Sequence, residues 1–258
     1  MLIALDIGNS HAAIGGFHGD ELLFVASMAT DDRQTGEQYA CGLQSIFALH
    51  GVRNEPIEGA VLSSVVPAMI PIMQHAISFL SDCRVLTVGA GVRTGLNIKS
   101  DQPRTLGTDR VAAAVWASCS AALPCIVVDL GTATTFTALD CQGVLVGSAI
   151  APGLHISLRA LGHAAAQLPE VRLDTPPKTV LGRTTADAIQ IGSVYGTASM
   201  IDGMLGRFAE ELHEVPEVLL SGSAVPFIQP YMRTPARWEP HIVLYGLALI
   251  WRRNQRQN

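Results

Sequence analysis

The feature that most constrains this chain is a strand-and-turn pattern that occurs twice. The segment LIALDIGNS begins at Leu2 and recurs as CIVVDLGTA from Cys125. Each copy reads as an apolar run, an aspartate, an apolar residue, a glycine and a small polar residue. The two aspartates, Asp6 and Asp129, are 123 residues apart in a chain of 258. A repeat at close to half the chain length indicates a duplicated unit.

Each copy continues into a predicted β-hairpin, the first over residues 11–26 and the second over residues 134–150. Both contain a strand, a glycine-bearing turn and a returning strand, which is the usual hairpin pattern. The simplest explanation is duplication of a hairpin followed by an α/β unit.

The rest of the chain alternates between short apolar runs and longer amphipathic segments. Strands are predicted over residues 59–64, 83–88 and 217–221. Helices are predicted over residues 35–50, 69–80, 110–122, 154–166 and 185–208, with a last helix after residues 241–244. This alternation predicts an α/β protein whose sheets are covered by helices, with a domain boundary near residues 121–124.

Composition excludes several classes of protein. The chain is 48% hydrophobic and 15% charged, which excludes a disordered chain. Its net charge of −5 argues against a general surface for nucleic acid or for anionic membranes, so we expect neither partner.

The expected compartment follows from three absences in the sequence. The five cysteines show no C-x-x-C spacing, which predicts buried, reduced thiols rather than a disulfide framework or a zinc site. The N-terminus lacks a basic segment, and no apolar stretch approaches the ~18 residues of a membrane span. We therefore expect a cytoplasmic protein.

The two D-x-G turns suit phosphate binding. Glycine lets the backbone approach a phosphate, and consecutive N–H groups can surround its oxygens. The carboxylate can hold a cation that offsets the phosphate charge. One such turn alone is more simply explained as ordinary turn chemistry at a strand end. Two copies at half-chain spacing favour the functional interpretation.

A second candidate site is the segment GTDR at residues 107–110, which precedes an alanine-rich predicted helix. Asp109 has two interpretations. It caps the helix, with Arg110 in the first turn, or it is a general base, with neighbouring N–H groups and Arg110 holding an anionic substrate. Thr185 likewise stands at the start of a predicted helix and is either its N-cap or a substrate contact.

The ordered set of motifs resembles the acetate and sugar kinase, Hsp70 and actin superfamily and, within it, the type III pantothenate kinases. The matching segments are DIGNS at 6–10, SSVVP at 63–67, GTDR at 107–110, DLGTATT at 129–135, APG at 151–153 and GRTTADAIQIG at 182–192. The resemblance implies two duplicated ribonuclease-H-like (actin-like ATPase) domains with a cleft between them, which we assign to residues 1–121 and 122–258.

The same resemblance implies a reaction, in which ATP phosphorylates pantothenate to 4′-phosphopantothenate, the first step of coenzyme A biosynthesis. It makes Asp109 the catalytic base and Thr185 a substrate contact across a homodimer interface. It assigns pantothenate binding to Gly107, Thr108, Asp109 and Arg110. It assigns ATP binding to Asp6, Ile7, Gly8, Asn9, Ser10, His11, Ala12, Ala13 and Thr132. It places Asp6 near Mg²⁺ and Asp129 at a monovalent-cation site for K⁺ or NH₄⁺.

This sequence departs from the family pattern at three positions. Thr184 stands where Asn is usual, Ser100 where many relatives have a Tyr lining the substrate pocket, and Ser223 where a glycine is common in the nucleotide loop. The added Cβ at Ser223 predicts a looser adenine contact. None of the three removes a group that the chemistry requires.

Two alternatives to the kinase stay open at this point, because the family also contains proteins named as transcriptional accessory factors. One is a non-catalytic regulator that binds a nucleotide, and the other is a hydrolase in which water replaces pantothenate. Two other features carry less weight. A metal site at His155 and His163 is disfavoured, because no acidic or cysteine partner stands at ligand spacing. The apolar segment 156–168 fits a dimer face or ordinary core equally well.

Overall fold

The computed structural model describes residues 1–102, 105–165, 167–173 and 179–255. The chain divides into two compact units. The first comprises residues 1–96, 101–116 and 241–258, and the second comprises residues 97–100 and 117–240. Each unit is built on a five-stranded mixed sheet, which confirms the predicted α/β class and the duplication.

The sheet of the first unit has the order β3-β2-β1-β4-β5. The strands are β1 (Leu2–Ile7), β2 (His11–His18), β3 (Glu21–Ala29), β4 (Gly59–Ser64) and β5 (Arg84–Thr87). Strands β1, β2 and β3 form an antiparallel meander, while β4 is parallel to β1 and β5 is parallel to β4. The ends of β1 and β4 therefore lie side by side, with Asp6 in register with Ser63.

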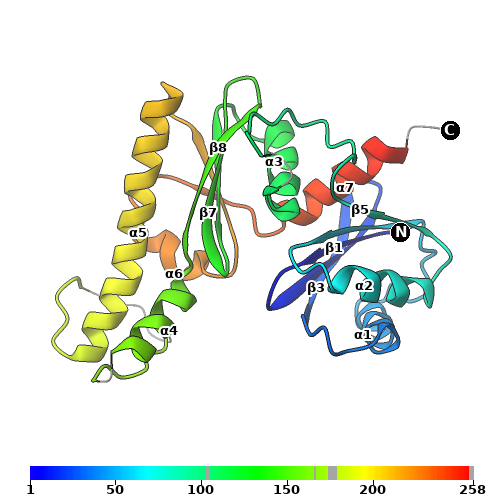
Figure 1. The fold of residues 1–258 in the computed structure, drawn as a ribbon, viewed down its shortest axis with the longest axis horizontal. Coiled ribbons are helices and arrows are strands. Elements are labelled where there is room, and N and C mark those ends of the chain that lie inside the picture. Colours follow the sequence, from blue (N-terminus) through cyan, green and yellow to red (C-terminus); the bar gives the residue numbers. More distant parts are fainter. Residues whose placement is uncertain (103–104, 166, 174–178, 256–258) are drawn as a thin grey trace. The chain divides into compact units, whose positions relative to one another are not determined.

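Helices cover both faces of this sheet because its central strands are apolar on both sides. On β1, Ile3, Leu5 and Ile7 point to one face, where they join a buried cluster with α1 (Gly36–Leu49) and α2 (Met69–Ser78). These two helices lie together beside the sheet in Figure 1.

The opposite face of the first sheet packs against α7 (Ile242–Gln255), which contacts β1, β2 and β4. Gly59 of β4 lies against the Trp251 ring, where any Cβ would overlap the indole. The backbone of α7 at Gly246 approaches Ala112 of α3 (Thr108–Ser120) equally closely. The glycines therefore permit two tight contacts on this face.

The position of α7 bears on the predicted domains. Assigning residues 1–121 and 122–258 to two domains groups α7 with the second half of the chain, whereas α7 packs within the first compact unit. The helix also begins at Ile242, within the HIVL segment after which it was predicted to start. The proposed boundary between two domains at residues 121 and 122 therefore stays a prediction.

The second unit repeats the strand pattern, with the order β10-β9-β6-β7-β8. The strands are β6 (Cys125–Leu130), β7 (Ala133–Leu139), β8 (Leu145–Pro152), β9 (Glu217–Ser221) and the short β10 (Arg237–Trp238). Again an antiparallel meander, β6-β7-β8, is extended by strands parallel to its first member. Asp129 is in register with Ser221, as Asp6 is with Ser63.

The long helix α5 (Thr185–Leu212) covers one face of the second sheet (Figure 1). It buries Val194, Ala198, Ile201 and Leu205 against the apolar side chains of β6 and β7. The helix α4 (Leu154–Ala164) and the short helix α6 (Val225–Ile228) pack beside it. The predicted helix over 154–166 includes Ala166, which lies outside the described residues.

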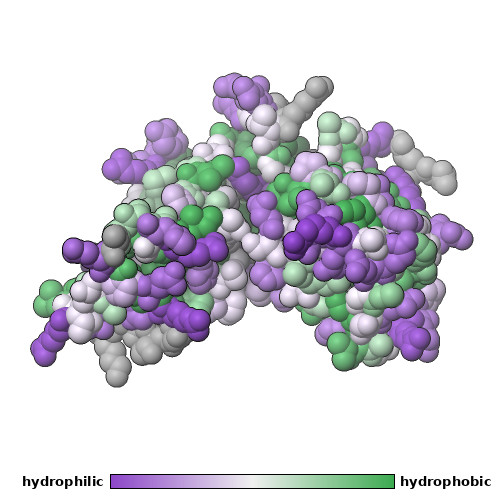
Figure 2. Space-filling model, turned by 60° about the horizontal axis from the view of Figure 1, so that its bottom comes forward, coloured by the Kyte–Doolittle hydropathy of each residue, from purple (hydrophilic) through white to green (hydrophobic). Residues whose placement is uncertain are grey.

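Figure 2 shows apolar side chains reaching the surface in small patches among hydrophilic ones. Cys125 is buried, but Cys41, Cys119 and Cys141 are exposed, so the prediction of buried thiols is wrong for these three. None of the five cysteines forms a disulfide bond. Among the described residues, no helix is long and apolar enough to span a membrane.

Candidate active site

The first D-x-G turn joins β1 to β2 through Asn9 and Ser10. Within it, the Gly8 N–H donates to the His11 carbonyl at 3.0 Å. Asn9, Ser10 and His11 are exposed, while Asp6 is half-buried at the end of β1. The turn therefore presents polar backbone and side-chain groups to solvent beside a carboxylate.

Asp109 lies in the first turn of α3, directly after Thr108. Thr108 Oγ1 is 2.9 Å from Ser63 Oγ, and Ser63 is the lateral neighbour of Asp6. Strand β4 therefore links the first D-x-G turn to the start of α3. The predicted base Asp109 and the predicted phosphate-binding turn come together within one unit.

The Asp109 carboxylate has an unusual environment. Its Oδ1 atom is buried and accepts no hydrogen bond within the described part of the chain. Buried carboxylate oxygens in proteins nearly always have a partner, so an exception calls for an explanation. Gly107 is also constrained, because a Cβ built there would overlap Asp109 Oδ1. The Gly107 carbonyl accepts from Val111 N–H at 3.1 Å, so the helix begins after Gly107 and Asp109 is not its N-cap.

Arg110 follows in the same helical turn and is half-buried. Burial lowers the pKa of its guanidinium, and the neighbouring Asp109 charge opposes that shift. Arginine nevertheless stays charged at neutral pH, and its planar fork matches carboxylates. The first turn of α3 therefore carries a fixed positive charge next to a carboxylate.

The second D-x-G turn, in the other unit, is one residue shorter than the first. Its Gly131 N–H donates to the Ala133 carbonyl at 3.1 Å, where the first turn spans from Gly8 to His11. Thr132 at its tip is exposed, and Asp129 is half-buried. Gly153, after β8, lies so close to the Gly131 and Thr132 carbonyls that a Cβ there would overlap both.

The segment after β9, where the family pattern places a nucleotide loop, packs against the end of β6. The Ala224 N–H donates to the Leu130 carbonyl at 3.1 Å. Gly222 has φ of +96°, a conformation that favours glycine, and a Cβ built there would overlap the Leu130 backbone. Ser223, the predicted departure, is exposed beside it.

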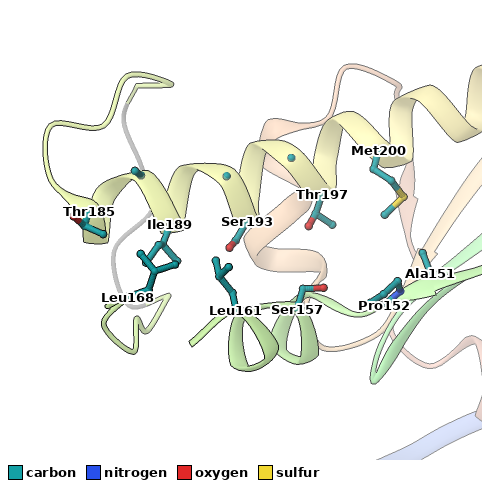
Figure 3. A pocket seen from close by; sticks show the side chains of 13 residues that line it. Ala151, Pro152, Ser157, Leu161, Leu168, Thr185, Ile189, Ser193, Thr197 and Met200 are labelled. Carbon is teal, nitrogen blue, oxygen red and sulfur yellow. The ribbon is translucent and has the colours of Figure 1, made fainter. Parts of the chain in front are cut away.

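A groove of about 630 Å³ runs between α4 and α5. Its walls are mainly apolar or small, including Leu161, Ile189 and Met200. Figure 3 shows Thr185 at one end of the groove and Pro152 near the other. Thr185 therefore lies at the opposite end of the groove from Pro152, which pairs with Ala133 of the second D-x-G turn.

The N-cap of α5 is Thr184, not Thr185. The Asp187 N–H donates to Thr184 Oγ1 at 3.1 Å, and the Thr184 N–H donates to Asp187 Oδ2 at 3.2 Å. This is a complete capping box. Threonine and asparagine both serve as N-caps, so the departure at Thr184 preserves the local structure. The Thr185 side chain therefore does not cap the helix.

Two further residues of this region were not singled out from the sequence. Ser63 was quoted only as part of a motif, although it links Asp6 to Thr108. Thr30, after β3, holds the first turn through two hydrogen bonds. The sequence carries no clear signal for Thr30, because the preceding strand does not alternate and the two carbonyls that Thr30 holds belong to a distant turn.

Comparison with known proteins decides the family. A family model described as type III pantothenate kinase matches residues 2–207. The chain is 36% identical over 256 residues to a type III pantothenate kinase of an Exiguobacterium species, covering 99% of this chain and 100% of the relative. This chain belongs to the type III pantothenate kinase family. The Brevibacillus brevis member is 37% identical over 255 residues, with the same coverage of both chains.

Solved structures show that the family fold is shared more widely. A ROK family glucokinase from Streptomyces griseus, in complex with glucose and AMPPNP, aligns with a TM-score of 0.54 and 13% identity. The alignment covers 96% of this chain and 97% of the glucokinase. The activator of the 2-hydroxyisocaproyl-CoA dehydratase from Clostridium difficile, with bound ADPNP, aligns with a TM-score of 0.53 and 11% identity over 100% of this chain and 98% of the activator. At these identities the likeness concerns the fold.

Proposed function

We propose that this pantothenate kinase uses Asp109 to position and deprotonate the primary hydroxyl of pantothenate, which then attacks the γ-phosphoryl group of ATP. The products are 4′-phosphopantothenate and ADP, and the reaction is the first step towards coenzyme A. The buried Asp109 Oδ1, which has no hydrogen-bond partner among the described residues, carries this proposal. A substrate hydroxyl that donates to Oδ1 supplies the missing partner.

The residues around Asp109 have matching roles. Arg110 binds the pantothenate carboxylate, for which its guanidinium is suited. Gly107 leaves room for the Asp109 carboxylate, and Thr108 is held by Ser63. Phosphoryl transfer passes through a loose transition state, so the position of the hydroxyl matters more than the strength of the base.

ATP binding is assigned to the first turn, over Asp6 to Ala13, and to Thr132 of the second turn. The chain has no Walker-type lysine loop, so backbone N–H groups and cations must balance the phosphate charge. Mg²⁺ is assigned to the phosphates beside Asp6, which holds it directly or through a bridging water. Asp6 is half-buried at the end of β1, where one carboxylate can share Mg²⁺ with the phosphates of ATP. Mg²⁺ commonly keeps several waters and phosphate ligands.

A monovalent cation, K⁺ or NH₄⁺, is assigned to Asp129. The half-buried carboxylate at the end of β6, beside the Gly131 backbone, suits such a cation. The test replaces potassium with choline. Activity should fall strongly in choline and return with K⁺ or NH₄⁺. Full activity in choline would contradict the assignment, and Asp129→Asn should remove the potassium dependence.

We also propose a homodimer in which Thr185 contacts the substrate of the partner subunit. Three glycines of α5, Gly192, Gly196 and Gly203, share one stripe, and a Cβ at each would meet open space. Each glycine in a helix costs about 1 kcal/mol relative to alanine. Gly192 and Gly196 line the groove between α4 and α5, and a second copy that packs closely into this groove would account for the glycines. Sedimentation should give twice the 27.3 kDa chain mass, and Gly196→Leu should give the single-chain mass.

The proposed compartment is the cytoplasm, where the five free cysteines stay reduced. The non-catalytic regulator is not favoured, since the curated relatives of nearly full length are named as kinases. One assay separates the kinase from both alternatives: ADP release measured with and without pantothenate. Pantothenate-dependent release supports the kinase. Release without pantothenate would indicate a hydrolase, and no release would indicate the regulator.

A further inference from the structure

Thr30 is the first residue after β3 and lies opposite the first D-x-G turn. Its Oγ1 donates to the Gly8 carbonyl at 2.8 Å, and its N–H donates to the Ser10 carbonyl at 3.0 Å. The second bond extends the β2–β3 ladder, in which His11 pairs with Ala29. One residue therefore holds two carbonyls of the turn through its side chain and its backbone.

These two bonds determine where the N–H groups of the turn point. In a trans peptide the C=O and the following N–H point in opposite directions. Because the Gly8 carbonyl faces Thr30, the Asn9 N–H faces away from it. Because the Ser10 carbonyl faces Thr30, the His11 N–H also faces away. Two N–H groups on the same side of a turn can bind one anion between them.

Thr30 is itself held in place by a buried tyrosine. Tyr39 of α1 is fully buried, and its hydroxyl accepts from the Asp31 N–H at 2.9 Å. The same hydroxyl lies 3.1 Å from the Ala29 and Asp31 carbonyls and can donate to one of them at a time. Tyr39 thus fixes the residues on either side of Thr30.

The second unit differs at the matching position. Extending the β7–β8 register, in which Ala133 pairs with Pro152, places Gly153 opposite Thr132, as Thr30 is opposite Ser10. There the contact is a close backbone approach without a hydroxyl. The longer first turn has an extra residue to restrain, and Thr30 supplies the additional hydrogen bond.

We propose that Thr30, supported by Tyr39, is a positioning residue for the nucleotide: it orients the Asn9 and His11 N–H groups toward the phosphates of ATP. This rests on the proposed role of residues 6–13 in ATP binding. Thr30 itself touches no reacting atom. Its effect is therefore expected in ATP recognition more than in pantothenate recognition.

The test compares Thr30→Val, which keeps shape and removes the hydroxyl, with Thr30→Ser, which keeps the hydroxyl. Loss of one such hydrogen bond predicts a KM for ATP about five- to tenfold higher in Thr30→Val. The KM for pantothenate should stay within about twofold, because both hydrogen bonds of Thr30 go to the first D-x-G turn and not to residues 107–110. Thr30→Ser should resemble the unsubstituted enzyme.

Two further variants keep the result interpretable. Tyr39→Phe removes only a hydroxyl and should also raise the KM for ATP; it decides the question if Thr30→Val does not fold. Thr35→Ala removes the N-cap of α1 without touching the turn. It should lower the melting temperature and leave the KM for ATP unchanged. This separates loss of stability from loss of positioning.

Asp6→Asn, measured in parallel, distinguishes failure of this inference from failure of the proposed ATP site. A raised KM for ATP in Asp6→Asn with an unchanged KM in folded Thr30→Val and Tyr39→Phe would overturn the role of Thr30 alone. An unchanged KM in all three variants would overturn the assignment of the turn to ATP, and with it the role of Thr30. A Thr30→Ser enzyme as impaired as Thr30→Val would also contradict the hydroxyl's role.

Discussion

Ser63 and Thr108 share a hydrogen bond, with 2.9 Å between Ser63 Oγ and Thr108 Oγ1, that ties the end of β4 to the first turn of α3. Ser63 is fully buried. Thr108 Oγ1 also lies 3.5 Å from the Ser64 carbonyl oxygen, which is a longer contact. This bond sets the position of Asp109 relative to Asp6, because Asp109 follows Thr108 and Asp6 is in register with Ser63.

The Ser63–Thr108 bond should therefore be measurable as a coupling. Ser63→Ala and Thr108→Val should each lower the free energy of unfolding by about 1 kcal/mol. The double variant should lose less than the sum of the two, since both substitutions remove one bond. Urea denaturation of the four proteins measures this. Strict additivity would show that the two hydroxyls do not interact.

Gly107→Ala should reduce turnover more than stability. The added Cβ overlaps Asp109 Oδ1, so the carboxylate must rotate away from its position. Displacing a catalytic group by about 1 Å can cost on the order of 10²-fold in rate. Gly89→Ala is the matched control, because a Cβ there meets open space. Steady-state kcat for both variants, with thermal melts, would reveal the difference. Equal kcat values in the two variants would contradict the claim that a Cβ at residue 107 displaces the Asp109 carboxylate.

Gly153→Ala should disturb the second D-x-G turn. A Cβ at this position overlaps the Gly131 and Thr132 carbonyls, which are backbone atoms and cannot move alone. Overpacking of this kind costs about 1–3 kcal/mol of unfolding free energy. Gly147→Ala in β8 is the control, with open space at its Cβ. We also expect a higher KM for ATP in Gly153→Ala, and a value like that of the control would contradict the assignment of Thr132 to ATP.

Cys125 should stay protonated and unreactive in the folded protein. Burial, together with the charge of Glu217, raises the pKa of its thiol to about 12, although Arg237 opposes the shift. The raised pKa means that the folded state favours the neutral thiol. Its contribution to stability is fully present below pH 9, the ordinary value, and is lost as the pH rises toward about 12.

Alkylation with iodoacetamide at pH 8 compares the reactivity of Cys125 with that of the exposed cysteines. The exposed Cys41, Cys119 and Cys141 should be modified in the native protein, and Cys125 only after denaturation. Peptide mass spectrometry identifies the modified residues. Modification of Cys125 at the rate of the exposed cysteines would show that β6 is not protected in solution.

Much of the fold was predictable because local patterns determine its elements. The strands at Gly59–Ser64 and Glu217–Ser221 match their predicted bounds, since each is a short apolar run between polar segments. The placement of α7 was not predictable in this way. Apolar periodicity identifies a helix but not the sheet that it covers. The contact between Trp251 and Gly59 places α7 on the first sheet, and these two residues are far apart in the sequence.

In the candidate site, too, some features could be predicted from the sequence and others could not. The twin aspartates and GTDR could be found from spacing, because a repeat is visible in one sequence. The Thr184 cap depends on which of two adjacent threonines has extended backbone, and only the structure distinguishes them. Thr30 belongs to no sequence motif, and only its two hydrogen bonds to the first D-x-G turn single it out.

The most direct test of the central claim is the turnover of Asp109→Asn. This isosteric change keeps the side chain's shape and removes its ability to accept the hydroxyl proton. We predict a loss of about 10²- to 10⁴-fold in pantothenate-dependent ADP release. ATP affinity, measured by calorimetry on the same preparation, should be unchanged. Turnover equal to that of the unsubstituted enzyme would contradict the assignment of Asp109 as the base.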